Sequence, residues 1–285
     1  MPINHDHVNL FKIKYNIGKQ GRGRRTFSNG LWKVSKMYLV VFFFGLIIGS
    51  FLNVCIYRLP RKESLILPPS HCPHCRTRLM ARDLVPLFSY LWLKGRCRYC
   101  GAVIYWRYPL VELLTGTIFV ALYCFFGPNF LLLKYLFLAC LLIIVTFIDL
   151  EYCLIPDRLN LVMLAGGILF SLITRDLLVA SLLWGAVIPA AMLAILAVIS
   201  RGGMGGGDVK LAAATGFFLG WPGNGVALLL ACLLAGATGS IFLFFKWKKR
   251  KDAIPFAPFF TVGIFLHIFW GEPLLKWYLN NLGFS

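Results

Sequence analysis

Residues 141–157 read LLIIVTFIDLEYCLIPD, and this stretch decides the fold class. An apolar run ends at Ile148, and Asp149, Glu151 and Asp157 follow directly. This pattern is typical of a membrane-spanning helix that reaches the aqueous surface at its end. An acid at membrane depth is energetically costly, so Asp149 indicates a functional site.

The rest of the chain repeats this pattern. Its 285 residues are 59% hydrophobic and 14% charged, and the mean hydropathy is +0.76. Long apolar runs alternate with short basic connectors, which predicts an all-α polytopic membrane protein with about eight transmembrane helices. The expected spans are residues 38–57, 109–126, 129–148, 159–174, 177–200, 209–221, 224–245 and 255–271. The sixth span is short, so it requires help from its flanks or a thinned bilayer.

The charge distribution predicts the orientation of these spans. The chain carries 29 basic and 11 acidic residues, a net charge of +18. No basic groove with interleaved aromatic residues accompanies it, so we expect the lipid bilayer as a partner and no nucleic acid. The connector 58–107 holds ten Lys and Arg, which places it in the cytosol by the positive-inside rule. Alternating spans then put residues 149–158, 201–208 and 246–251 on the same side.

The N-terminal tail does not fit this topology. Residues 1–36 carry eight further Lys and Arg on the side that should lie outside. Either the tail is a basic extension that the other loops outweigh, or the native chain begins at Met37, and we favour the second hypothesis. The expected organisation is a basic tail at 1–36, a first span at 37–57, a cytosolic connector at 58–107 and a membrane-embedded core at 108–285.

Four of the nine cysteines form two CxxC pairs in the connector, CPHC at 72–75 and CRYC at 97–100. Two such knuckles separated by 21 residues match a tetrahedral four-cysteine zinc site. Four thiolates leave no open coordination position, so we expect the zinc to be structural. The sequence therefore predicts a zinc-ribbon-like insertion between the first and second spans. Its expected ligands are Cys72, Cys75, Cys97 and Cys100.

A second acid at membrane depth complements the first. Asp208 opens the sixth span, and the topology brings it to the same membrane face as Asp149. Two carboxyl groups that share a partly buried site cannot both ionise easily. An ionised Asp can then take a proton from water while a protonated Asp polarises a carbonyl, as in an aspartic protease. Gly205, Gly206 and Gly207 would let a substrate backbone approach closely. The alternative is a flexible hinge with Asp208 as a helix N-cap.

Two other functional classes fit single features of the chain. Intramembrane acids also mark ion and proton paths, so a transporter or channel is one alternative. A non-enzymatic scaffold that uses the cysteine ribbon for docking is another. Neither class explains the acids, the glycines and the cysteines together.

Six motifs, in order, resemble those of the type IV prepilin peptidase family, which are membrane aspartic proteases of the GxGD type. They are GSFLNVCIYRLP (49–60), the two cysteine knuckles, RYPLVELLTG (107–116), FIDLEYCLIPD (147–157), MGGGDVKL (204–211) and IPFAPF (254–259). The resemblance covers nearly the whole chain from Met37 onward.

The resemblance implies roles for particular residues. Asp149 matches the family's first catalytic aspartate and Asp208 its second. Gly205 and Gly207 match the two glycines of GxGD, and the four knuckle cysteines match the zinc-binding thiolates. Asp157 is a weaker catalytic candidate, since its alternative role is to cap the start of the fourth span.

The resemblance also implies an activity. Members cut the basic leader peptide from type IV prepilins or pseudopilins at the cytosolic face of the bacterial plasma membrane. Many then methylate the new N-terminus with S-adenosylmethionine, although this chain has no glycine-rich strand-to-helix signature for that cofactor. A strongly basic enzyme cannot attract a basic leader by its overall charge. We therefore expect recognition through the apolar substrate helix and through local acids, with Glu151 and Asp157 as candidates.

Overall fold

The computed structural model describes residues 24–199, 205–246 and 254–281. The chain divides into two units, residues 1–40 and 41–285, and the candidate sites lie in the second. The described residues are almost entirely helical, and their only extended pairing is two isolated bridges in the connector. The predicted all-α class is therefore confirmed.

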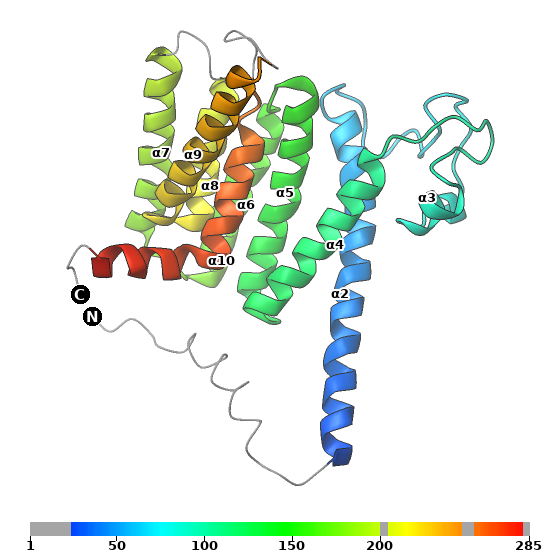
Figure 1. Ribbon diagram of the computed structural model, residues 1–285, viewed down its shortest axis with the longest axis horizontal. Coiled ribbons are helices and arrows are strands. Elements are labelled where there is room, and N and C mark those ends of the chain that lie inside the picture. Colours follow the sequence, from blue (N-terminus) through cyan, green and yellow to red (C-terminus); the bar gives the residue numbers. More distant parts are fainter. Residues whose placement is uncertain (1–23, 200–204, 247–253, 282–285) are drawn as a thin grey trace. The chain divides into compact units, whose positions relative to one another are not determined.

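Eight helices account for the eight expected spans (Figure 1). They are α2 Arg24–Arg58, α4 Arg107–Phe126, α5 Phe130–Tyr152, α6 Asp157–Thr174, α7 Val179–Ile199, α8 Gly206–Leu219, α9 Gly223–Phe244 and α10 Ala257–Asn281. Within the connector lie only the 3₁₀ turn η2 Ala81–Asp83 and the short helix α3 Phe88–Trp92.

Length separates these helices into two groups. Six of them are long and apolar enough to cross a membrane: α2 (from Lys36), α4, α5, α6, α7 and α9. Of the other two, α8 is shorter, with 14 residues, and α10 contains the apolar stretch Ala257–Gly271. The short sixth span that the hydropathy predicted is thus present as α8.

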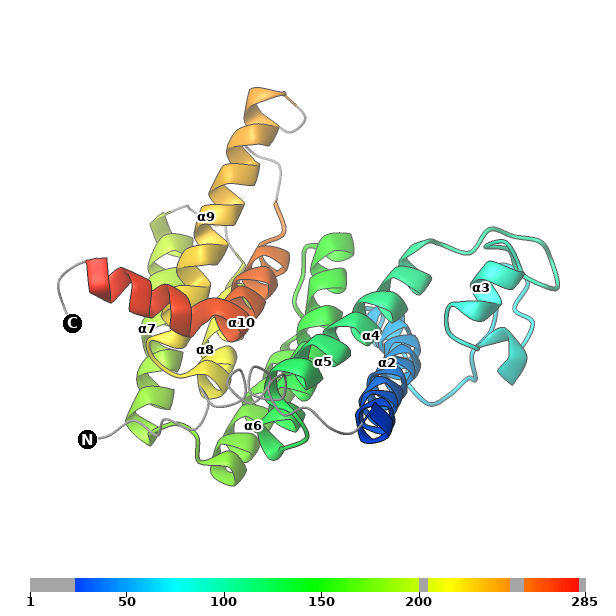
Figure 2. The same cartoon turned by 60° about the horizontal axis from the view of Figure 1, so that its bottom comes forward.

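Helix α5 forms the centre of the core. It packs against α4, α6 and α10, and Figure 2 shows it among these helices. Side chains on several of its faces, such as Leu138, Leu142 and Ile148, are fully buried. A helix that is apolar all round is stable only in such a buried position or in lipid. The carboxyl end of α5 therefore carries Asp149 into the protein interior.

Helix α8 lies between α6 and α7, and small residues allow the close approach. A Cβ added to Gly216 would lie 2.3 Å from the backbone nitrogen of Ala186 on α7. Asn224 of α9 reinforces this packing, because its amide donates 2.8 Å hydrogen bonds to the carbonyl oxygens of Gly185 and Ala212. Small residues at helix contacts are the usual means of packing helices in a bilayer, where lipid is as apolar as leucine.

The sequence GLIIG at 45–49 provides the same kind of contact between α2 and α4. A Cβ added to Gly45 would lie 2.7 Å from the Cα of Gly116, and one added to Gly49 would lie 2.8 Å from the Cα of Glu112. This GxxxG spacing places both glycines on one helix face. The first span is thereby fixed against the second.

The helix contacts predict the effect of adding a single methyl group. Gly216→Ala should destabilise the protein by about 1–3 kcal/mol, because overpacking shifts the α7 backbone. Gly236→Ala on α9 is the control, since an added Cβ there meets nothing within 4 Å. Thermal unfolding in lipid–detergent mixtures should show a lower midpoint for Gly216→Ala only. Equal midpoints for the two variants would contradict this packing.

Candidate active site and metal centre

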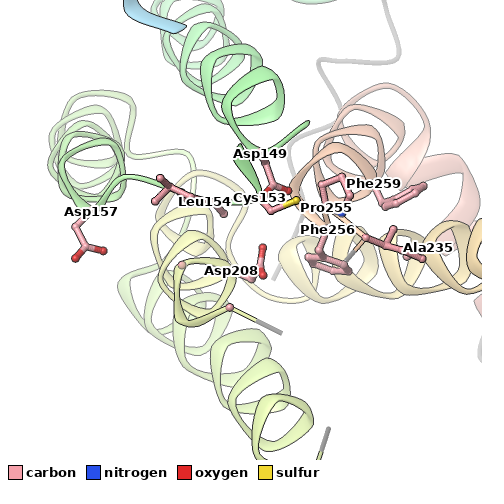
Figure 3. A pocket seen from close by; sticks show the side chains of 13 residues that line it. Asp149, Cys153, Leu154, Asp157, Asp208, Ala235, Pro255, Phe256 and Phe259 are labelled. Carbon is pink, nitrogen blue, oxygen red and sulfur yellow. The ribbon is translucent and has the colours of Figure 1, made fainter. Parts of the chain in front are cut away.

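Asp149 and Asp208 reach one cavity from different helices. Asp149 lies in the last turn of α5 and Asp208 is the third residue of α8. Their exposed fractions are only 5% and 9%. Both line a cavity of about 560 Å³, where Figure 3 shows the two carboxyl groups facing each other. They are close enough for their charges to interact, so the structure brings together the two acids that the sequence paired.

The start of α10 orients Asp149. Its Oδ2 accepts a 3.0 Å hydrogen bond from the backbone N–H of Ala257, the first residue of α10. The first N–H groups of a helix have no partner within it and readily bind an anionic oxygen. The motif IPFAPF therefore contributes a backbone donor to the site, a role that the sequence analysis did not assign. The signal in the sequence that could have indicated this role is Pro255, which lies shortly before the first residue of the helical run.

Asp208 has a different environment. Its backbone N–H donates to the carbonyl oxygen of Gly205 at 3.1 Å, which fixes it in the first turn of α8. Its side-chain Oδ1 is buried and has no hydrogen-bond partner among the described residues. A buried polar atom without a partner is costly. Asp208 therefore retains hydrogen-bonding capacity that a reactant in the cavity can use.

The three glycines before Asp208 are not equivalent. Gly205 and Gly207 line the cavity. A Cβ on Gly205 would lie 3.6 Å from Asp208 Oδ2, and one on Gly207 would lie 3.0 Å from the Cβ of Ile155. A Cβ on Gly206 would meet nothing within 4 Å. Packing is thus tight only at Gly207, whereas a Cβ on Gly205 would make an ordinary contact and would occupy space in the cavity. Residues 201–204 of the predicted loop lie outside the described residues.

Asp157 lies at the edge of the same cavity, and Figure 3 shows its side chain apart from the facing pair. Its Oδ1 accepts a 2.7 Å hydrogen bond from Lys210 Nζ, which makes an ion pair, and the Asp157 side chain is 72% exposed. It is the first residue of α6, and the N-cap is Pro156. The expectation that Asp157 caps this helix is therefore wrong by one position.

Another part of the cavity wall is apolar. Ala235 of α9 and Ile254, Pro255, Phe256 and Phe259 around the start of α10 line it. Pockets that bind organic ligands typically combine such walls with a few polar groups, and this volume is in their usual range. The cavity can therefore hold a peptide segment with an apolar side chain beside the two acids.

An ion pair ties the connector to the helix that carries Asp149. Arg107, at the start of α4, donates to Glu151 near the end of α5, and the Arg107 side chain is buried. Sequence spacing gave no sign of this pair, because the two residues are 44 positions apart. It engages one of the two acids expected to recognise a basic leader.

The four connector cysteines form one cluster. The Sγ atoms of Cys72, Cys75, Cys97 and Cys100 lie within 4.8 Å of one another, and the Cys72 and Cys100 sulfurs are 3.9 Å apart. Zinc–sulfur bonds of about 2.3 Å in a tetrahedron require sulfurs about 3.8 Å apart, so these residues fit the ion.

The two knuckles share one backbone pattern. Cys72 N–H donates to Thr77 O and Arg76 N–H to Cys72 O, while Cys97 N–H donates to Ala102 O and Gly101 N–H to Cys97 O. Arg76 and Gly101 both have a positive φ, 56° and 72°. Hydrogen bonds from the side chain and backbone of Thr77 lower the pKa of the Cys75 thiol to about 6. A metal-binding thiolate is thus available at neutral pH.

A separate ion pair braces the second knuckle. The carboxylate of Asp83 accepts from Arg98 Nε at 2.6 Å, from the Tyr99 hydroxyl at 2.9 Å and from the Met80 N–H at 3.1 Å. Burial opposes ionisation, but the hydrogen bonds from Arg98, Met80 and Tyr99 outweigh it and lower the pKa of Asp83. The turn η2 is thereby fixed to the cysteine cluster.

Comparison with known proteins agrees with this arrangement. Residues 43–126 match the bacterial peptidase A24 N-terminal domain, and residues 136–240 match the type IV leader peptidase family. The chain is 37% identical over 273 residues to a prepilin leader peptidase/N-methyltransferase of Aeromonas hydrophila, covering 86% of this chain and 94% of that protein. Proteins of the same name from Legionella pneumophila and Bacillus subtilis (strain 168) are each 36% identical, with 86% of this chain and 95% and 98% of theirs covered. No solved structure matches the chain. The chain belongs to the type IV leader peptidase family.

Proposed function

We propose that this protein is a membrane-embedded aspartic endopeptidase that removes the basic leader peptide from type IV prepilins or pseudopilins. Membership of the type IV leader peptidase family supports this reaction. The observation that carries it is the pair Asp149 and Asp208, which two helices bring to one cavity. The excess of Lys and Arg in the connector supports a cytosolic orientation of this face in the bacterial plasma membrane.

In the proposed reaction the two carboxyl groups share one proton. The ionised group takes a proton from water as the water attacks the scissile carbonyl, and the protonated group donates to the carbonyl oxygen. The Ala257 N–H keeps the Asp149 carboxyl oriented toward the cavity. Protonation behaviour belongs to the pair and to neither residue alone.

The surroundings of the pair support a way for the substrate to approach. The apolar segment of a prepilin can lie along the spans, with an apolar side chain against Phe256 and Phe259. The peptide bond at the membrane surface then meets the acids without a deep water channel. Of the two acids expected to bind the leader, Glu151 is engaged by the buried Arg107. Asp157 is the better candidate, because an exposed ion pair such as that with Lys210 contributes little stability.

N-methylation of the new N-terminus is the second proposed activity. Its support is the name of the relatives, prepilin leader peptidase/N-methyltransferase, of which this chain covers more than nine-tenths. S-adenosylmethionine would be the methyl donor. The four-cysteine cluster would hold a structural zinc ion that fixes the shape of the connector.

Replacing either acid should stop cleavage. Asp149→Asn and Asp208→Asn keep the size of the side chain but remove its titrating proton, so each should lower cleavage of a model prepilin by about 10²-fold or more. Glu63→Gln, which changes an exposed acid of the connector outside the cavity, is the control, and it should retain cleavage of the same order as the wild type. Membranes containing each variant at equal levels provide the assay. Normal cleavage by either of these two variants would refute the catalytic role of the residue that it replaces.

The glycines provide a finer test of access to the cavity. Gly205→Ala places a methyl group beside Asp208 Oδ2, so kcat/KM should fall by about tenfold or more, as small displacements in an active site commonly do. Gly206→Ala adds the same methyl group to open space and should remain close to wild type. Equal losses at the two positions would indicate a general loop effect instead of blocked access.

The metal proposal predicts one zinc ion per chain. Elemental analysis of the purified protein should find zinc in the wild type and in Asp208→Asn, but not when all four cysteines are replaced by serine. Because metal binding and local folding are coupled, limited proteolysis should cut residues 58–107 faster in the four-serine variant. Retention of zinc by that variant would exclude the cluster as the site.

A further inference from the structure

Glu112 is a buried acid that the proposed chemistry does not use. It lies on α4 five residues after Arg107, at membrane depth, where an ionisable group requires an explanation. Its Oε2 accepts a 2.8 Å hydrogen bond from the backbone N–H of Leu87. Leu87 is the N-cap of α3 and has a positive φ of 59°. A carboxyl group within a span therefore holds the start of a connector helix.

A second contact shows how deep α3 lies. The rings of Phe88 on α3 and Phe43 on α2 stack with centroids 6.4 Å apart. Phe43 precedes Arg58, the last residue of α2, by 15 residues, which is about 22 Å along a helix. The hydrocarbon core of a bilayer is only about 30 Å thick. Figure 1 likewise shows α3 alongside α2 and α4 and below their upper ends.

The free face of α3 is strongly apolar. Phe88, Leu91 and Trp92 are 57%, 71% and 83% exposed. Exposed apolar side chains on α2, such as Ile47 and Phe51, belong to the membrane-spanning part of that helix. A cluster of this kind marks an interaction surface, and here its position beside the spans makes it continuous with their lipid-facing side.

Most backbone amide groups in and after α3 have partners within the protein, as a hydrocarbon environment demands. Amide groups at 88, 89, 91, 93, 94 and 95 donate to carbonyl oxygens within residues 85–91. Leu87 N–H has no such partner, and Glu112 supplies it. In lipid every backbone polar group must be satisfied within the protein. The long side chain of Lys94, directly after the apolar run, can extend its charge back toward the headgroups.

We propose that residues 87–93, with α3 at their centre, form a re-entrant element that enters the hydrocarbon core of the bilayer from the connector side. Its partner is the acyl-chain region of phospholipids, which Leu91 and Trp92 contact. Glu112 is its tether. Only the remainder of the expected cytosolic connector 58–107 is then in water. This inference does not depend on the proposed peptidase activity.

Depth-dependent fluorescence quenching tests the insertion. A genetically encoded dansyl amino acid replaces Trp92 or Ile66 in the full-length protein, reconstituted in vesicles of phosphatidylglycerol and mid-chain brominated phosphatidylcholine. Ile66 is the matched control: it is 82% exposed, and Arg58 holds its segment at the end of α2 through Ser64 O and Pro68 O. Brominated lipid should quench position 92 several-fold more than position 66, and aqueous iodide should show the reverse order. Equal quenching by the lipid, or stronger iodide quenching at 92, would overturn the proposal.

A pair of variants tests the tether separately. Glu112→Gln retains an oxygen that can accept from Leu87 N–H, whereas Glu112→Ala does not, and both remove the charge. Lipid quenching at position 92 should persist in Glu112→Gln and fall in Glu112→Ala. Equal quenching in the two variants would exclude Glu112 as the tether.

Discussion

Two carboxyl groups buried in one cavity among apolar helices are the constraint on which the rest of this structure depends. An acid at this depth is expensive unless the protein supplies its partners. The start of α10 supplies a backbone donor to Asp149, and the Gly205 turn fixes Asp208 at the start of α8. Both devices use helix ends, where unpaired backbone groups are available. These backbone contacts hold the two acids in place at the cavity.

Helix packing and contacts with the connector fix the positions of these helix ends relative to one another. Gly216 allows α8 to approach α7, and the α5 end is tied to α4 through Glu151 and Arg107. Arg107 also ends the connector, so the segment that carries the cysteine cluster joins directly to the helices around the proposed active site. The tether from Glu112 to α3 adds a second attachment of the connector. Distortion of the connector should therefore reach the acids through α4 and α5.

Hydropathy predicted the eight helices because each apolar run is a property of local sequence. The two acids, the glycines and the CxxC pairs were found for the same reason, since their spacing is local. The Ala257 donor, the Arg107–Glu151 pair and the position of α3 were missed, because they depend on which helices become neighbours. The different roles of Gly205 and Gly206 could not be told from the sequence, where they are adjacent glycines. In the structure Gly205 lines the cavity and Gly206 does not. The roles of the acids and of the cysteines remain predictions.

We propose that Asp149 and Asp208 act as one catalytic unit. A double-mutant cycle on prepilin cleavage tests this, with kcat/KM measured for Asp149→Asn, Asp208→Asn and the double variant. Residues that share one proton lose their function together, so the double variant should be no slower than the slower single variant. Losses that multiply in the double variant would show that the two acids act independently, and would contradict the shared pair.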